Sequence, residues 1–348
     1  LETCDHCDSM VARYHSCRDR HCPKCQTMTK ERWIEARNAE LLTVPHYHLV
    51  FTLPHALNPL IQGNPRCLYD LLFKAASETL LTFGRDRRWI GGELGITLVL
   101  HTWSQNLGQH VHVHGLVTGG GLAPDGNQWK SSKKRFLFPV KALSKVFQAK
   151  YLELLAHAAR QGKLRFGGST LSLADHRAFA AFIADLKGSD WVVYAKAPFS
   201  GPRQVVAYLG RYTHKAAISN ERILSLENGQ VRFRWRDYRD GSMIKIMQLD
   251  ATEFIRRFLL HVLPSGFMRI RHYGLFANRH RKTKLAHCRA LLHQPEPELR
   301  SKETTEAMVE RLTGHDITKC TICGRGHMKT VMKLRPIRPT WSTGPPRS

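Results

Sequence analysis

The alternating run His-Val-His-Val-His at residues 110–114 constrains this chain more than any other feature. On a β-strand successive side chains point to opposite faces, so a period of two puts the three imidazoles on one face and the two valines on the other. The run continues as Gly-Leu-Val to residue 117. We therefore expect a strand over residues 110–117, with the valines in a core and the histidines on the opposite face.

Imidazole is the commonest metal ligand in proteins, and two imidazoles two residues apart are well placed to hold one divalent ion. We predict such a site at His112 and His114, the alternative being a polar, solvated strand face. A third ligand is needed, and we favour Gln105 because it lies closest in the expected hairpin. Imidazole together with an amide oxygen suits Mg²⁺ or Mn²⁺, with open positions for phosphate oxygens. The residues alone leave several other candidates for this position: His101, His46, His48, Gln204 and His214.

Seven of the nine cysteines are clustered, which is typical of metal sites in a reducing compartment and not of a disulfide framework. Two Cys-x-x-Cys pairs can complete one tetrahedral Zn²⁺ site, and we predict that site from Cys4, Cys7, Cys22 and Cys25. Cys17 and His21 either replace a member of this set or bind a second ion, and Cys17 is otherwise a buried thiol. Cys320 and Cys323 form half of another site, which His315 and His327 could complete.

The charge balance points to a polyanionic partner. There are 53 Lys and Arg against 28 Asp and Glu, a net charge of +25, and 42% of the residues are hydrophobic. Such a composition excludes an acidic disordered polymer and indicates a globular protein with a basic surface. The mean hydropathy of −0.34 and the lack of a long apolar run argue against a membrane span.

A tyrosine pair lies downstream of the histidine strand. Tyr208 and Tyr212 are four residues apart, as are Arg211 and Lys215, so each pair shares a side of the helix that we expect after Pro202. Seen alone, such a tyrosine pair is more often core packing than chemistry. A tyrosine hydroxyl with a pKa of about 10 is a weak nucleophile, and it needs a metal or flanking cations to attack a phosphodiester. The histidine strand could supply that metal.

Two basic segments are candidates for DNA binding. The first interleaves cations with a ring, which suits contact with phosphates and stacking on unpaired bases, although a solvated sheet edge would look similar. It comprises Arg232, Arg234, Trp235 and Arg236. The second is a basic helix with Arg279, Arg281, Lys282 and Lys284.

The apolar periodicity predicts an α+β fold with four regions. We expect helices over 31–43, 65–83, 139–161, 175–187, 250–262 and 277–293, and strands over 46–53, 95–102 and 190–196, with a three-stranded meander within 221–249. The regions are a zinc-binding domain (1–43), a nuclease domain (44–220), a DNA-binding extension of meander and basic helices (221–293), and a linker with a half zinc site and a disordered tail (294–348).

These motifs together resemble a known group of enzymes. His112-Val113-His114 followed by a tyrosine helix resembles the HUH endonuclease superfamily, and the doubled pattern from Tyr208 to Lys215 resembles its two-tyrosine rolling-circle branch. Within that branch the chain is most similar to insertion-sequence transposases of the IS-ninety-one type, which carry an N-terminal zinc-binding domain. The resemblance spans nearly the whole chain, through residues 4–25, 48–58, 110–122, 208–220 and 269–281.

The resemblance implies a central antiparallel sheet flanked by helices, with the HUH pair on the sheet and the tyrosine helix beside it. Mg²⁺ or Mn²⁺ would polarise a phosphate of single-stranded DNA, one tyrosine would form a 5′-phosphotyrosine link, and the second would take the other strand. It also implies a bacterial cytoplasmic protein that acts on element ends and target DNA. Because the sequence shows no Walker-type phosphate loop, a helicase would come from the host. The alternatives are a rolling-circle replication initiator and a non-enzymatic, zinc-dependent DNA-binding regulator.

Overall fold

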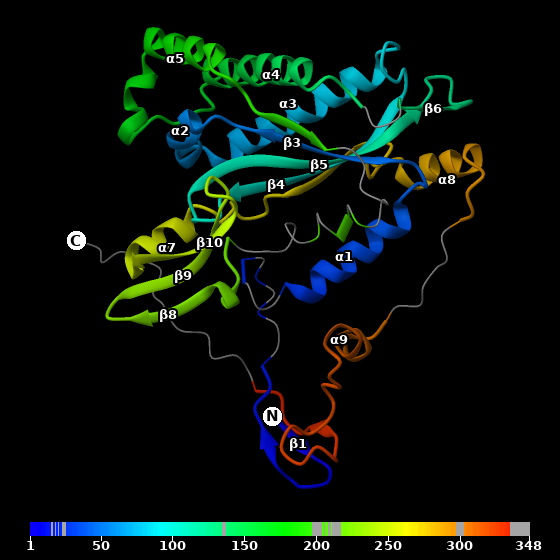
Figure 1. Cartoon of the computed structure of the whole chain (residues 1–348), viewed down its shortest axis with the longest axis vertical. Helices are drawn as coiled ribbons and strands as arrows, with labels where there is room; N and C mark the ends of the chain where they lie inside the picture. Colours follow the sequence, from blue (N-terminus) through cyan, green and yellow to red (C-terminus); the bar gives the residue numbers. More distant parts are fainter. Residues whose placement is uncertain are drawn as a thin grey trace. The chain divides into compact units, whose positions relative to one another are not determined.

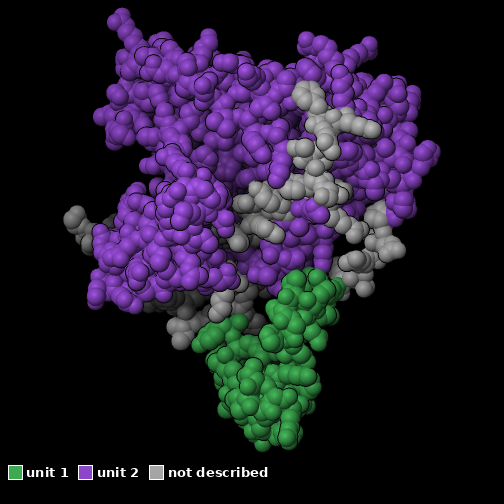
Figure 2. All heavy atoms as spheres, in the orientation of Figure 1, with its two compact units in different colours: residues 1–18, 299–348 green, residues 19–298 purple. Residues whose placement is uncertain are grey.

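A computed structural model gives the fold of the chain. It describes residues 1–14, 17, 19, 21–22, 26–133, 137–196, 204, 206–207, 210, 217–296 and 303–334. The chain forms two compact units, one made of residues 1–18 and 299–348 and the other of residues 19–298 (Figure 2).

The larger unit is built on an antiparallel sheet of six strands (Figure 1). The strand order is β11-β4-β5-β3-β7, with β6 paired to β5. The expected hairpin of β4 and β5 is confirmed. Within it His101 lies directly opposite His112. The strands are β3 (His46–Thr52), β4 (Glu93–Trp103), β5 (Gln109–Leu122), β6 (Trp129–Ser131), β7 (Val193–Lys196) and β11 (Ile270–Gly274).

One face of this sheet forms the main core, as the alternation at 110–114 predicts. Val111 and Val113 are buried there beside Phe51 and Leu98. Burying each such side chain contributes about 1.5–3 kcal/mol, so this face holds the sheet to its helices. The helices are α2 (Asn58–Gly63), α3 (Pro65–Arg85), α4 (Val140–Arg160) and α5 (His176–Gly188), and Figure 1 shows α3, α4 and α5 on the same side of the sheet.

The opposite face carries the histidines, and α1 (Thr27–Glu40) lies on that side (Figure 1). Leu116, two residues beyond His114 on β5, packs there with Val206 and with Trp33 and Ile34 of α1. A polar chain also ties the helix to the sheet: Arg37 Nη1 is 3.0 Å from His272 Nε2, whose Nδ1 is 2.9 Å from Thr97 Oγ1.

The expected meander is confirmed as β8 (Ile223–Glu227), β9 (Gln230–Asp237) and β10 (Met243–Asp250), with β9 in the centre. Asn228 and Gly229 have φ values of 49° and 73°, which is the left-handed pair that a two-residue hairpin turn requires. The helix α7 (Ala251–Leu259) covers one face, where the rings of Phe233 and Phe254 lie 5.6 Å apart.

The smaller unit joins the two ends of the chain. The strands β1 (Glu2–Cys4), β2 (Met10–Val11) and β12 (Met328–Thr330) form one sheet, in which Cys4 lies opposite Met328. A helix, α9 (Thr305–Thr313), starts at the side-chain cap of Thr304, in a region where we expected partly a linker. The unit therefore differs from the predicted division, because strands of two or three residues leave no periodicity in the sequence.

The other expected helices and strands within the described residues are found within a few residues of their predicted bounds, whereas most of the helix expected after Pro202 lies outside them. The basic helix is α8 (Arg281–Leu291), and it packs through Leu285 and Cys288 against Leu275 and Phe276. The strand β11 was not predicted. Among the described residues, no helix is both long and apolar enough to cross a membrane.

Buried neutral histidines make the stability of this fold sensitive to acid. Burial lowers the pKa of His46, His261 and His272 from 6.5 to about 4. Below pH 6.5 the unfolded chain binds more protons than the folded one. Each histidine therefore lowers the free energy of unfolding by up to about 1.4 kcal/mol per pH unit as the pH falls towards 4. We expect denaturant unfolding to show that the free energy of unfolding falls in acid. In His261→Gln this free energy should depend less steeply on pH. A constant unfolding midpoint between pH 7 and 4.5 would contradict the assignment.

Candidate metal centres and DNA-binding surfaces

Three histidines converge on the face of the central sheet that lies opposite the main core. His112 and His114 lie on β5 and His101 lies on β4, and each side chain is no more than 7% exposed. His112 Nε2 is 2.9 Å from His101 Nδ1 and 3.1 Å from His114 Nε2. Together the three nitrogens form a group that could hold a metal ion.

The nitrogen spacing fits a single metal ion. For metal–nitrogen bonds of about 2.1 Å, two ligands at 90° lie about 3.0 Å apart, whereas tetrahedral ligands lie about 3.4 Å apart. The two separations at His112, 2.9 and 3.1 Å, are short enough for one ion to contact all three nitrogens. Three ligands on one side would leave the other positions of a six-coordinate ion open for phosphate oxygens and water.

The third member of this group is His101, one of the candidates that the sequence offered beside the favoured Gln105. A register shift lies between His101 and Trp103, and it leaves His101 paired directly with His112. Gln105 lies beyond the end of β4, where its backbone carbonyl accepts a hydrogen bond from Arg222. The sequence placed both residues in the right hairpin, but only the register could choose between them.

Contacts behind the ligands orient two of the imidazoles. His112 Nδ1 is 3.0 Å from the carbonyl oxygen of His110, and His114 Nδ1 is 2.9 Å from His48 Nε2. The rings of His48 and His114 stack with an interplanar angle of 10°. With a metal on Nε2 of each ligand, both Nδ1 atoms carry a hydrogen and donate these bonds, which fixes the tautomer and the ring plane.

The electrostatics of the cluster favour neutral imidazoles, the form that binds metal. Burial, followed by the charge of His110, lowers the pKa of His112 from 6.5 to about 3. Burial also lowers the pKa of His48 to about 4, with a smaller contribution from Lys196. The pKa values of His101 and His114 are lowered too, first by burial and then by their histidine neighbours.

The tyrosine motif lies outside the described residues, and so do its four named members Tyr208, Arg211, Tyr212 and Lys215. Two residues beside Tyr208 are described. Val206 is fully buried against Leu116, and a Cβ on Gly210 would lie 2.5 Å from Ile34 Cδ1. Both contacts place these flanking residues on the face of the sheet that carries the histidines.

Four cysteines from the two ends of the chain meet in the smaller unit. Cys4 Sγ is 3.7 Å from Cys323 Sγ, and Cys7 Sγ is 3.8 Å from Cys320 Sγ. A tetrahedron with zinc–sulfur bonds of about 2.3 Å has edges of about 3.8 Å, so these sulfurs fit a structural Zn²⁺. The backbone N–H groups of His6 and Ile322 lie 3.4 Å from Cys4 Sγ and Cys320 Sγ. The N–H of Gly326 donates to Cys323 and lowers the pKa of this thiol to about 6.

This cluster differs from the predicted set of Cys4, Cys7, Cys22 and Cys25, of which it contains the first two. The structure pairs the first Cys-x-x-Cys with Cys320 and Cys323, because β1 and β12 are neighbours in the sheet. Cys22 belongs to the larger unit, and Cys25 lies outside the described residues. The two Cys-x-x-Cys turns resemble each other in the structure, since each is followed by a residue with positive φ, Asp8 at 54° and Gly324 at 66°.

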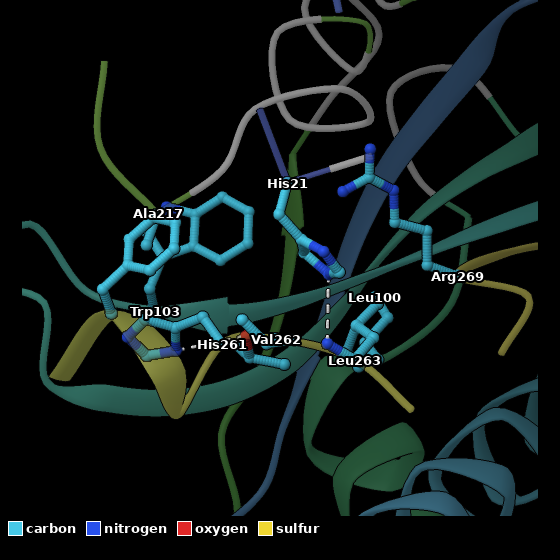
Figure 3. A pocket seen from close by; sticks show the side chains of 10 residues that line it. His21, Leu100, Trp103, Ala217, His261, Val262, Leu263 and Arg269 are labelled. Carbon is cyan, nitrogen blue, oxygen red and sulfur yellow. Dashed lines mark hydrogen bonds between the residues drawn. The ribbon is translucent and has the colours of Figure 1, made fainter. Parts of the chain in front are cut away.

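His21 has a structural contact in the larger unit. Its Nε2 accepts a hydrogen bond of 3.2 Å from the backbone N–H of Leu263, and its Nδ1 lies 3.3 Å from Asp19 Oδ1. Figure 3 shows the ring pointing at Leu263 in a small pocket that Trp103 and Arg269 also line. The contact with Leu263 occupies Nε2, which argues against the alternative that this nitrogen replaces a cysteine ligand.

The basic residues of β9 separate by face. Arg232, Arg234 and Arg236 are exposed on one face of the meander. Trp235 points to the other face, where it packs with Phe233 and Val231. The arginines therefore form an exposed stripe. Trp235 lies on the other face, whereas we expected its ring to lie among the arginines.

Two of the four basic residues expected on the second DNA-binding segment hold the fold together. Arg281 pairs with Glu40 of α1 at 3.1 Å, and Lys284 pairs with Glu93 of β4 at 2.5 Å. Arg279 and Lys282 are exposed. Only the last two stay candidates for a contact with DNA.

Comparison with known proteins identifies the family. The Y2_Tnp family, described as "Putative transposase", matches residues 95–284, and the "Transposase zinc-binding domain" family of IS91 matches residues 1–53. "Putative transposase y4qJ" of Sinorhizobium fredii (strain NBRC 101917 / NGR234) is 47% identical over 100% of this chain and 87% of its own length. The transposase for insertion sequence element IS801 of Pseudomonas savastanoi pv. phaseolicola is 30% identical over 89% of this chain and 73% of its own.

The chain belongs to the IS91-type transposases. Among solved structures it is similar to the conjugative relaxase TrwC in complex with oriT DNA, in a metal-bound structure. That match has a TM-score of 0.26 and 18% identity, and it covers 48% of this chain and 70% of the relaxase chain. The zinc-binding match ends at residue 53, so it includes the predicted set of Cys4, Cys7, Cys22 and Cys25 but not the C-terminal pair.

The cysteine cluster predicts how zinc is held in the transposase. We expect Cys320→Ser to lower the zinc content of the full chain by about one equivalent, since one ligand of a closed four-coordinate site is lost. Cys67→Ser, which changes a cysteine on α3, should leave the content unchanged. Gly326→Ala should also release zinc, because its Cβ would lie 2.5 Å from Cys4 Sγ. Metal analysis decides, and full zinc in Cys320→Ser would exclude this ligand set.

The contact between His48 and His114 predicts a metal-affinity phenotype. We expect His48→Leu to weaken Mn²⁺ binding about 10- to 100-fold, because the acceptor for His114 Nδ1 is removed. His48→Gln, which restores an acceptor oxygen, should recover part of the loss. Isothermal titration without DNA measures both, with His157→Leu on the far side of the sheet as the control. Equal affinity in His48→Leu and the unaltered transposase would show that His48 does not support the ligand.

Proposed function

We propose that this transposase cleaves and rejoins single-stranded DNA at the ends of its element through a covalent 5′-phosphotyrosine intermediate. The observation that carries the proposal is the convergence of His101, His112 and His114 on one face of the sheet. That site is suited to a phosphodiester because three neutral nitrogens on one side of an ion leave room for phosphate oxygens on the other.

The three histidines would hold Mg²⁺ or Mn²⁺, which supplies charge stabilisation for the phosphate oxygens in the transition state. The protein would contribute orientation. The carbonyl of His110 and the ring of His48 fix two imidazoles, and the valines of the same strand anchor β5 in the core. A site held this way needs little reorganisation when the substrate binds.

Tyr208 or Tyr212 would provide the nucleophile. Its phenolic oxygen loses a proton and forms a bond to the phosphorus, while the bond from phosphorus to the 3′ oxygen of the preceding nucleotide breaks. That oxygen takes up a proton and leaves as a free 3′-OH. The new link keeps one phosphodiester for the one that is broken, so a 3′-OH can rejoin it without an energy-rich cofactor.

The described residues beside the motif support this role. Val206 and Gly210 contact the histidine face and α1, so their contacts are compatible with a tyrosine near the metal. Arg211 and Lys215 would stabilise the phenolate and the transferred phosphate. Two tyrosines would allow one to act on each of two strands.

Element ends and target DNA would be held largely through charge. The exposed stripe of Arg232, Arg234 and Arg236, together with Arg279 and Lys282, would contact phosphates. Such contacts are weakened by salt and carry no sequence information. Opening of the duplex would fall to a helicase of the host cell.

A covalent adduct tests the mechanism directly. We expect labelled single strands that carry the element ends to form, with Mg²⁺ or Mn²⁺, a protein–DNA adduct that survives denaturing electrophoresis. Tyr208→Phe/Tyr212→Phe should abolish the adduct because neither position then has a nucleophile. His112→Ala should lower cleavage by at least about 100-fold through loss of the metal, while most DNA binding remains.

The two variants exclude different parts of the mechanism. An adduct formed by Tyr208→Phe/Tyr212→Phe would rule out both tyrosines. A loss of DNA binding in His112→Ala that parallels the loss of cleavage would indicate a structural role for the histidine cluster. Strand transfer from the adduct to a second oligonucleotide would separate rejoining from nicking alone.

A further inference from the structure

The outer face of the edge strand β7 carries residues that neither the motifs nor the family matches single out. Along this strand Trp191 and Val193 are buried in the main core. The side chains that alternate with them point the other way, and Val192 is 60% and Tyr194 53% exposed. Lys196 is exposed as well.

The register places these side chains on the same face of the sheet as the metal cluster. Val50 of β3 lies opposite Tyr194 on one side and opposite His114 on the other. Tyr194 is therefore level with His114, and two strand spacings, about 10 Å, separate their backbones. A substrate bound at the histidines reaches β7 by crossing β3.

Lys196 lies two residues further along the same face. It is directly opposite His48, the residue whose ring stacks on the ligand His114. An ammonium group at this position adds positive potential beside the cluster, where a phosphate would lie.

The chemistry of the three side chains matches one ligand. A flat aromatic ring, exposed and rising from a strand, can stack on an unpaired base, and a neighbouring cation can hold the phosphate backbone. Duplex DNA offers no exposed base face to Tyr194. An acidic peptide would satisfy Lys196 but would make no use of the ring next to it.

We propose that Val192, Tyr194 and Lys196 form a binding surface for the single strand of DNA next to the scissile phosphate, with Tyr194 stacking on a base and Lys196 binding a phosphate. The proposal rests on the proposed function, since it is the metal cluster that brings the strand to this face. It assigns to β7 a positioning role that is separate from the attack by a tyrosine.

Binding to a fluorescein-labelled oligothymidylate, without metal and followed by anisotropy, tests the surface on the full chain. Tyr194→Ala should weaken binding about five- to 100-fold, the range of one stacked base, and Tyr194→Phe should keep the affinity. Lys196→Ala should make the slope of log affinity against log salt shallower by about 0.7, the value for one phosphate contact on a single strand. Lys196→Arg should restore the slope.

Matched controls separate this surface from general effects. Lys187→Ala removes an exposed cation from α5, on the opposite side of the sheet, and should leave the affinity for oligothymidylate nearly unchanged. Thermal unfolding shows whether each variant is folded. Unchanged affinity and salt slope in folded Tyr194→Ala and Lys196→Ala would overturn the proposal.

The adduct assay distinguishes this inference from the proposed function. If the unaltered transposase forms the adduct and the β7 variants bind normally, only the inference fails. If the unaltered transposase forms no adduct on any element end, the tyrosine mechanism fails whatever β7 does. Loss of the adduct in Tyr194→Phe would show that its hydroxyl takes part in the reaction, which contradicts a role limited to stacking.

Discussion

The two-faced character of β5 is the constraint on which the larger unit depends. Val111 and Val113 are packed in the main core, so the side chains between and beyond them must emerge on the other face. A slip of one residue would move the valines out of the core and the histidines into it, at a cost of several kcal/mol for the lost apolar burial alone. The packing that stabilises the fold therefore also fixes where His112 and His114 point.

This constraint explains which parts of the site were predictable. Period-two alternation is local, and it was enough to predict the strand, its core face and two ligands. The third ligand depends on how β4 is aligned with β5, and a register shift near the end of β4 pairs His101 with His112. Sequence gives no direct measure of such a shift, so Gln105, which looked nearest to the histidines, was preferred over His101. The basic segment on β9 was predicted from charges and a ring counted together without regard to face, so Trp235 was grouped with arginines that lie on the other face.

The cysteine cluster shows the opposite situation, in which local pattern misleads. Two Cys-x-x-Cys pairs near one end looked sufficient for a zinc site, but the partners of Cys4 and Cys7 come from more than 300 residues away. Closing a flexible loop of that length costs only about 5 kcal/mol, because the entropy grows with the logarithm of length. Structural zinc sites contribute about 10–16 kcal/mol, so metal binding can offset the closure. Sequence distance was therefore a poor reason to prefer the nearer pair.

The two metal sites also differ in a way that follows from their ligands. Four thiolates would leave a tetrahedral zinc with no open position, so no substrate could bind to that ion. Such a site suits a structural role in linking the two ends of the chain. Three imidazoles on one side of a sheet leave positions open, and the residues around them decide what enters. On this face the neighbours are an aromatic ring and an ammonium on β7, while Arg281 and Lys284 are paired with glutamates within the fold. The basic residues behind the net charge of +25 therefore have two roles. Some form ion pairs within the fold, and others are exposed, where they can attract a polyanionic substrate.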